Sequence, residues 1–143
     1  MRIAADAGIR LNIKSVVAIS PPVEPANAMT AMNKGWFVYE KYFFHRWAKS
    51  LKTKLAHFPE LNYREDLSAA TSLDDLNNFF IPQFTDYADT NSYFSAYAVT
   101  GDRLSGLTVP AYILASADDP IIPVADFKNI APNPWLEISI QKY

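Results

Sequence analysis

The sequence lacks cysteine altogether, which excludes disulfides, thiolate metal sites and cysteine nucleophiles. It also lacks an excess of basic residues: the formal net charge is -2, so there is no electrostatic footprint for nucleic acid. No apolar run reaches membrane-spanning length, and residues 1–14 contain no apolar core long enough for a signal peptide. We therefore expect a soluble, cytoplasmic protein that does not bind nucleic acid.

Glycine and histidine are scarce, with 4 and 2 residues respectively, so few positions can supply a glycine-framed turn or a histidine side chain for catalysis. Hydrophobic residues, in contrast, make up 50% of the 143 positions. That share is enough for one modest globular domain with a buried core.

Three segments have the composition of β-strands. Residues 13–20 (IKSVVAIS) form a continuous β-branched run rather than an alternating one, which predicts a strand covered on both faces. Residues 109–116 (VPAYILAS) predict a buried strand, and residues 134–143 (PWLEISIQKY) predict one more. A short helix before the first strand is predicted to end at Gly8 in the left-handed conformation, and another helix starts within 124–130. Strands alternating with helices predict an α/β fold with a mostly parallel sheet.

The middle of the chain, residues 23–100, is predicted to be a helical insertion, because its apolar residues recur at helical spacing and glycine is nearly absent. Residues 35–59 predict one long amphipathic helix. Ser72 and Asp75 have the spacing of a capping box, which predicts the start of a second helix, and a third is expected over 91–99. The apolar stripe of the long helix consists of Trp36, Phe43, Trp47, Leu51 and Leu55, while Lys41, Lys49, Lys52 and Lys54 occupy other faces.

The chain therefore divides into a helix end and strand at 1–22, the helical insertion at 23–100 and a C-terminal sheet portion at 101–143. The first strand of the C-terminal portion is followed by two acids, Asp118 and Asp119. In a parallel sheet the functional crevice lies outside the carboxyl ends of the strands. An acid at this position is placed for chemistry rather than for packing.

Several motifs in one order resemble a known family. The strand followed by D-P-I-I-P resembles the acid turn of α/β-hydrolases, which supplies the acid of a catalytic triad. The chain further resembles the YheT-like branch of that superfamily, carboxylesterases with a helical cap, in the segments 18–22 (AISPP), 34–47 (KGWFVYEKYFFHRW), 73–94 (LDDLNNFFIPQFTDYADTNSYF) and 107–123 (LTVPAYILASADDPIIP). The resemblance implies the C-terminal part of an α/β-hydrolase fold, with residues 23–100 as the cap or lid.

The resemblance also implies a serine hydrolase that cleaves a small apolar ester, with Asp119 as the triad acid because it directly precedes P-I-I-P. In this fold the order is a serine on a nucleophile elbow, then the acid, then a histidine. None of the 4 glycines frames a serine, and both histidines, His45 and His57, precede the acid. We therefore expect a fragment that lacks the elbow and the catalytic histidine and has no esterase activity by itself.

Other interpretations stay open. Asp118 and Asp119 could simply be solvated residues of a turn, without a chemical role. The histidines and nearby acids lack the i, i+4 and H-E-x-x-H spacings of metal sites, so we predict neither a metal nor a cofactor. The basic, aromatic helix could lie on a membrane surface, although packing on the sheet is the favoured reading. Finally, the chain could be a non-catalytic remnant of the hydrolase fold that binds a partner.

Overall fold

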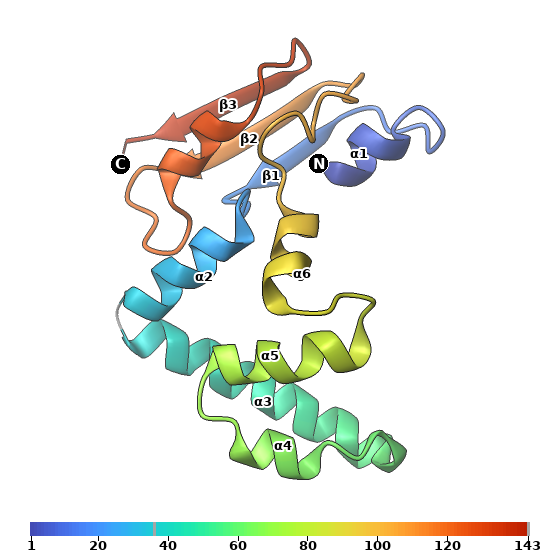
Figure 1. Cartoon of the computed structure of the whole chain (residues 1–143). Helices are drawn as coiled ribbons and strands as arrows, with labels where there is room; N and C mark the ends of the chain where they lie inside the picture. Colours follow the sequence, from blue (N-terminus) through green and yellow to red (C-terminus); the bar gives the residue numbers. More distant parts are fainter. Residues whose placement is uncertain (36, 143) are drawn as a thin grey trace. The chain divides into compact units, whose positions relative to one another are not determined.

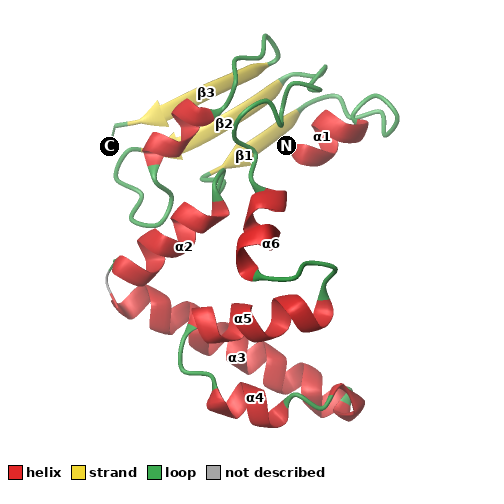
Figure 2. Ribbon diagram, viewed as in Figure 1, coloured by secondary structure: helices red, strands yellow, loops and turns green. Residues whose placement is uncertain are grey.

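The computed structural model describes residues 1–35 and 37–142, so Trp36 of the predicted stripe and Tyr143 of the predicted last strand lie outside the described residues. A helix and a strand come first, helices fill the middle, and two strands follow (Figures 1 and 2). The elements are α1 (Arg2–Ala7), β1 (Val16–Ile19), α2 (Pro25–Lys34), α3 (Phe37–His57), η1 (Pro59–Leu61), α4 (Arg64–Ala69), α5 (Leu73–Phe84), α6 (Thr90–Tyr97), β2 (Ala111–Ser116), η2 (Val124–Asn129) and β3 (Leu136–Gln141).

Contacts divide the chain into two compact units. Residues 1–31 and those from Phe94 onward form the sheet unit, and Met32–Tyr93 form the helical unit. The helical unit is narrower than the predicted insertion at 23–100, because most of α2 and the second half of α6 belong to the sheet unit.

The sheet unit is built on three parallel strands in the order β1-β2-β3. Both pairings are parallel, and in their register Val16 pairs with Ala111, which in turn pairs with Leu136. The carboxyl ends of the three strands therefore share one edge of the sheet. The described chain is therefore a mixed α/β protein with a small parallel sheet, which confirms the predicted class.

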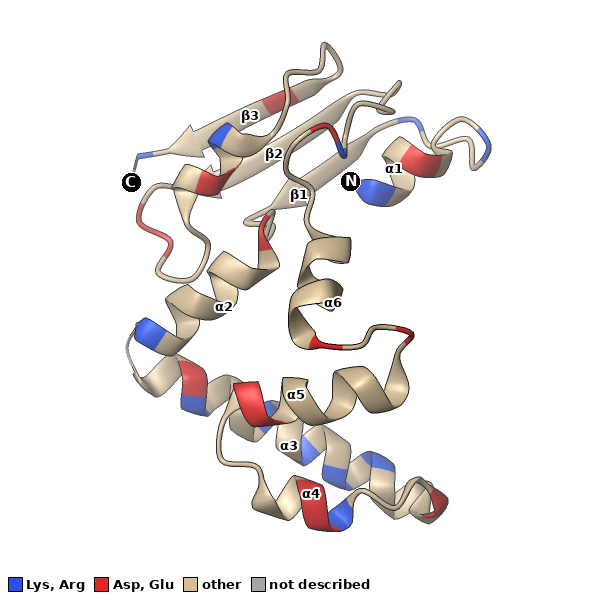
Figure 3. Ribbon diagram, viewed as in Figure 1, with Lys and Arg blue, Asp and Glu red and all other residues tan. Residues whose placement is uncertain are grey.

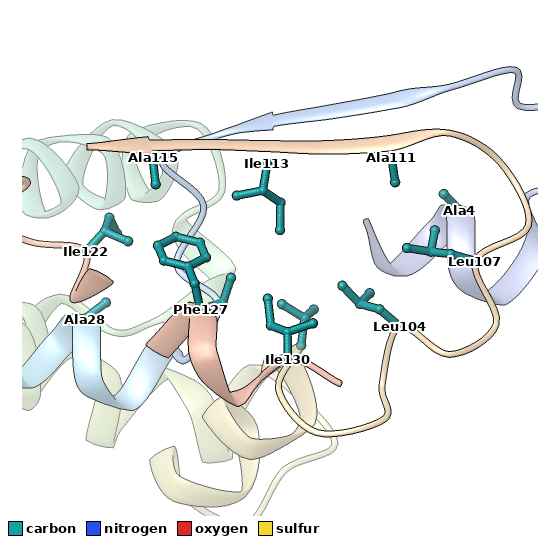
Figure 4. Close-up of a cluster of buried hydrophobic side chains, with 12 residues drawn as sticks. Ala4, Ala28, Leu104, Leu107, Ala111, Ile113, Ala115, Ile122, Phe127 and Ile130 are labelled. Carbon is teal, nitrogen blue, oxygen red and sulfur yellow. The ribbon is translucent and has the colours of Figure 1, made fainter. Parts of the chain in front are cut away.

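The core of the sheet unit lies against one face of the sheet. Along β2 the side chains alternate between buried and exposed, and Ala111, Ile113 and Ala115 all point to the buried side. Figure 4 shows all three on the side of β2 where Phe127 and Ile130 lie, with Ala4 of α1 near Ala111 and Ala28 of α2 on the same side. Helices and loops of the sheet unit therefore supply the cover for this face.

The opposite face of the sheet exposes apolar side chains. Val17 and Ile19 of β1 are 62% and 73% exposed, and Tyr112 and Leu114 of β2 are 44% and 38% exposed. The prediction that residues 13–20 form a strand covered on both faces is therefore wrong for the described structure. The physical reason is that the buried cluster reaches β1 from one side only, through Val16 and Ala18.

Gly8 also differs from expectation. Its φ is -54°, an ordinary right-handed value, and its N–H donates to the carbonyl of Ala4. The left-handed residue in this region is Asn12, with φ of 53°. A Cβ at position 8 would lie only 2.4 Å from the Ala4 carbonyl oxygen. Glycine is therefore required here for space rather than for a left-handed turn.

The helical unit packs around its own core. Leu55, Tyr63, Leu67 and Leu76 are buried together, with Trp47, Leu51, Phe44 and Phe80 packed against them. The long helix predicted at 35–59 is confirmed as α3, but Phe43 is 39% exposed and does not belong to the inward stripe. Phe44 takes that position, because a helix turns about 100° per residue and Phe44, Leu51 and Leu55 share one side.

Candidate functional site

The turn after β2 is the place where the sequence puts its candidate acid. The strand ends at Ser116, and the chain turns through Asp118, Asp119 and Pro120. Because the strands are parallel, this turn lies at the carboxyl edge of the sheet. Asp119, the predicted triad acid, is thus located at the edge where α/β proteins bind their ligands.

The carboxylate of Asp119 is fixed by the backbone that follows it. Its Oδ1 accepts hydrogen bonds from the backbone N–H groups of Ile121 and Ile122, each at 2.9 Å. Ile122 is buried in the core and Ile121 packs against it, so both donors are anchored. Pro120, which has no N–H, stands between the acid and these donors.

The second oxygen of Asp119 remains available. Among the residues that the structure describes, Oδ2 accepts no hydrogen bond, and the residue is only half-buried. A carboxylate with one oxygen immobilised and one free can accept a directed hydrogen bond from an N–H donor such as an imidazole. The turn therefore presents an oriented acceptor rather than a freely rotating charge.

Asp118 has different surroundings. It is exposed, and its Oδ1 accepts a short hydrogen bond from the hydroxyl of Ser116, two residues earlier. The core-anchored N–H groups of Ile121 and Ile122 donate to Asp119 and not to Asp118. The geometry thus separates two acids that are adjacent in the sequence.

A buried polar pair stabilises the segment after the acid turn. Asp126 of η2 is 5% exposed, and its Oδ1 accepts a hydrogen bond of 2.8 Å from Nδ2 of Asn27 on α2. Its Oδ2 is buried without a partner in the described part of the chain. No local sequence pattern indicates this pair, because its partners are separated by 99 positions.

Ser20 occupies the carboxyl end of the neighbouring strand β1. Its φ is 44°, which is uncommon for a residue other than glycine. Its N–H donates to the carbonyl oxygen of Leu114 at 2.8 Å and so continues the pairing of β1 with β2. This left-handed residue turns the chain out of the sheet toward Pro21 and Pro22.

The other titratable residues considered for chemistry have separate roles. His45 and His57 are exposed on α3, and Nδ1 of His45 lies 2.7 Å from the carbonyl oxygen of Lys41. A hydrogen bond from the Thr71 backbone N–H lowers the pKa of Asp75, and one from Ser92 lowers the pKa of Asp89. Nowhere in residues 1–35 and 37–142 do three such groups gather closely enough to hold a metal ion.

Comparison with protein-family models, with curated proteins and with solved structures found no match to this chain. In the described residues, no helix has both the length and the apolar character required to cross a bilayer. The structure defines the class of the protein as mixed α/β with a parallel sheet. Any assignment of function rests on the acid turn and on the sequence motifs around it.

Proposed function

We propose that this chain supplies the acid of a Ser-His-Asp triad in an enzyme that hydrolyses carboxylic esters, an α/β-hydrolase of the YheT-like branch. The observation that carries the proposal is the state of Asp119. It follows a parallel strand, its Oδ1 is held by two backbone N–H groups, and its Oδ2 is free to accept a further hydrogen bond. The motifs that resemble the family support the same assignment.

In this proposal Asp119 acts on the histidine and not on the ester. Its Oδ2 accepts the Nδ1 hydrogen of the imidazole, so that Nε2 faces the serine hydroxyl in the basic tautomer. The imidazole takes the hydroxyl proton as the serine oxygen attacks the ester carbonyl, and the carboxylate stabilises the imidazolium that forms. The histidine that donates to Asp119 is neither His45 nor His57, since both precede the acid and this fold places the histidine after it.

The helical insertion has a different role in the proposal. Residues 23–100 are assigned as the cap that shapes specificity for a small apolar ester. The aromatic residues of this segment include an edge-to-face pair, Tyr87 and Tyr93, whose ring centroids are 5.4 Å apart. Such rings supply rigid apolar surface of the kind that lines ligand sites.

The test compares two asparagine variants of the whole reading frame that contains these residues. With p-nitrophenyl butyrate as substrate, Asp119→Asn is expected to lower kcat by roughly 10⁴-fold, because an amide in place of the carboxylate selects the wrong imidazole tautomer. Asp118→Asn is the matched control and is expected to stay within about twofold of wild type, as for an ordinary surface substitution. Unchanged turnover in the first variant, or equal losses in both, would overturn the assignment.

A further inference from the structure

The exposed surface of α3 carries an unpaired array of cations. Its members, all exposed, are Lys41, Arg46, Lys49, Lys52 and Lys54. In the part of the chain that the structure describes, none of them lies within ion-pair distance of a carboxylate. The one acid of the helix, Glu40, is engaged elsewhere: its Oε1 accepts a hydrogen bond of 3.1 Å from the backbone N–H of Leu73. The cationic face is therefore not neutralised by its own helix.

Apolar side chains are exposed on the same face. Phe37, Val38 and Tyr42 are 71%, 50% and 57% exposed. With Lys41, Arg46 and Lys49 they line an open groove of about 520 Å³ on the surface of α3. The Lys41 ammonium lies 5.7 Å from the centre of the Phe37 ring. Cationic heads and apolar surface are thus interleaved along the first half of the helix.

This face is not needed for the fold of the helical unit. Ala48 and Leu55 of α3 belong to that core and pack with Tyr63, Leu67 and Leu76. At about 100° per residue, Val38, Tyr42 and Arg46 lie on the opposite side of α3. Phe37 is in line with Leu55 but lies at the start of the helix, outside this core. A surface helix normally has one apolar stripe, directed to the core, and a polar opposite face. Here the side opposite the core exposes Val38 and Tyr42 beside its cations, which marks it as an interaction surface.

Charge within the helical unit is segregated rather than evenly mixed. Figure 3 shows Lys and Arg (blue) recurring along α3, whereas the first turns of α4 and α5 carry Asp and Glu (red). The formal charge of the whole chain is -2, so the cationic face is a local feature and not a consequence of a basic protein. A partner that matches it must be anionic over the length of one helix.

We propose that the exposed face of α3 docks on the surface of an anionic lipid bilayer. The lysine and arginine heads meet the lipid phosphates and carboxylates, while Phe37, Val38 and Tyr42 enter the boundary between headgroups and acyl chains. An acidic protein segment would account for the cations alone and would leave Phe37 and Val38 in water. This proposal goes beyond the triad assignment and does not depend on it.

The test is flotation of the chain with vesicles of phosphatidylcholine alone or with added phosphatidylserine. Binding is expected only to vesicles that contain phosphatidylserine. It is also expected to weaken as the salt concentration rises above about 0.1 M, where the Debye length is about 10 Å, because salt screens the charges. The Arg46→Gln, Lys49→Gln double variant is expected to partition roughly 30-fold less, the equivalent of about 1 kcal/mol per cation. The control, Arg10→Gln with Lys14→Gln, removes the same charge from an exposed loop and is expected to bind normally.

Further variants separate this face from the exposed face of the sheet. Phe37→Ser with Val38→Ser is expected to reduce the binding that survives at high salt, whereas Val17→Ser with Ile19→Ser is expected to leave vesicle binding unchanged. The proposal is overturned by equal binding to neutral vesicles, by loss only in the sheet variant, or by binding to polyglutamate without binding to vesicles. Circular dichroism of each variant establishes that its helices are intact.

Discussion

At the scale of single residues, Asp75 shows how local hydrogen bonds fix a charge. Its Oδ2 accepts from the backbone N–H groups of Thr71 and Ser72, and its own N–H donates to Ser72 Oγ, which confirms the predicted capping box of α5. The bonds from Thr71 and Ser72 hold the pKa of Asp75 below its ordinary 3.8. The charged form is therefore preferred in the folded chain.

This pKa predicts a pH-dependent contribution to stability. Because the folded pKa lies below the unfolded one, the contribution is complete above pH 3.8 and is lost as the pH falls through the folded pKa. Asp75→Asn is expected to unfold at lower urea than wild type near neutral pH, and the two curves are expected to converge in stronger acid. Asp86→Asn is the control, because Asp86 is an exposed acid of the helical unit that takes no part in the capping box of α5. A difference that persists unchanged in acid would contradict the prediction.

Tyr63 is the residue on which the core of the helical unit most depends. It is 2% exposed, its hydroxyl donates to the carbonyl oxygen of Leu51 at 3.0 Å, and its ring meets those of Phe80 and Phe84 edge-to-face. Tyr63→Phe is expected to cost about 1 kcal/mol for the lost hydrogen bond. Tyr63→Ala is expected to cost about 3–5 kcal/mol, as for other buried aromatic truncations. Urea unfolding followed by far-UV circular dichroism measures the free energy of unfolding of both variants. Similar losses of stability in the two would show that the Tyr63 ring contributes little beyond its hydroxyl.

The sequence predicts residues well where the determinant is local. Ser72 and Asp75 form their cap because three positions suffice to specify it. Asp119 is found at a strand end because the strand and the acid are contiguous. Asp126 and Asn27 could not be paired in advance, since tertiary packing alone brings them together. The sequence predicts a left-handed turn at Gly8, whereas the close approach of the Ala4 carbonyl explains why glycine occupies this position.

At the scale of elements, the sheet predicts how the chain behaves in solution. Its exposed face presents Tyr112 and Leu114, and large apolar patches of this kind drive association. Tyr112→Thr with Leu114→Thr replaces both apolar groups by a β-branched residue that favours a strand, and is expected to reduce self-association of the chain. Light scattering after size-exclusion chromatography measures the change in apparent mass.

The matched control lies between these two positions on the same strand. Ile113 is 1% exposed and points into the core, so Ile113→Thr is expected to destabilise the fold rather than to improve solubility. If both variants behaved alike, the alternation of buried and exposed side chains along β2 would be contradicted.

Element types followed from the sequence more reliably than their environments. The helices α3, α5 and α6 were predicted from periodicity and capping, and the strands from β-branched runs. The helix predicted from Val124 is instead a short 3-10 helix, η2. The sequence predicts that β1 is buried on both faces, because Val17 and Ile19 are as apolar as Val16. Composition shows what a face could bury and does not show whether a partner element is present.

At the scale of the whole molecule, the triad proposal predicts that this chain is catalytically silent by itself. A fluorophosphonate probe labels a serine that an adjacent general base activates. The chain of 143 residues is expected to remain unlabelled, whereas the whole reading frame that contains it is expected to label at one serine. In-gel fluorescence distinguishes the two, and labelling of the isolated chain would contradict the account.

The most direct test of the central claim, that Asp119 is a triad acid, is to sequence the DNA on both sides of these codons and translate it in frame. The account predicts a Gly-x-Ser-x-Gly elbow encoded before Met1 and a histidine encoded after Tyr143, in the order that the fold requires. A translated frame without such a serine and histidine would contradict the claim. The exposed faces of α3 and the sheet would then remain as the functional features of a binding protein.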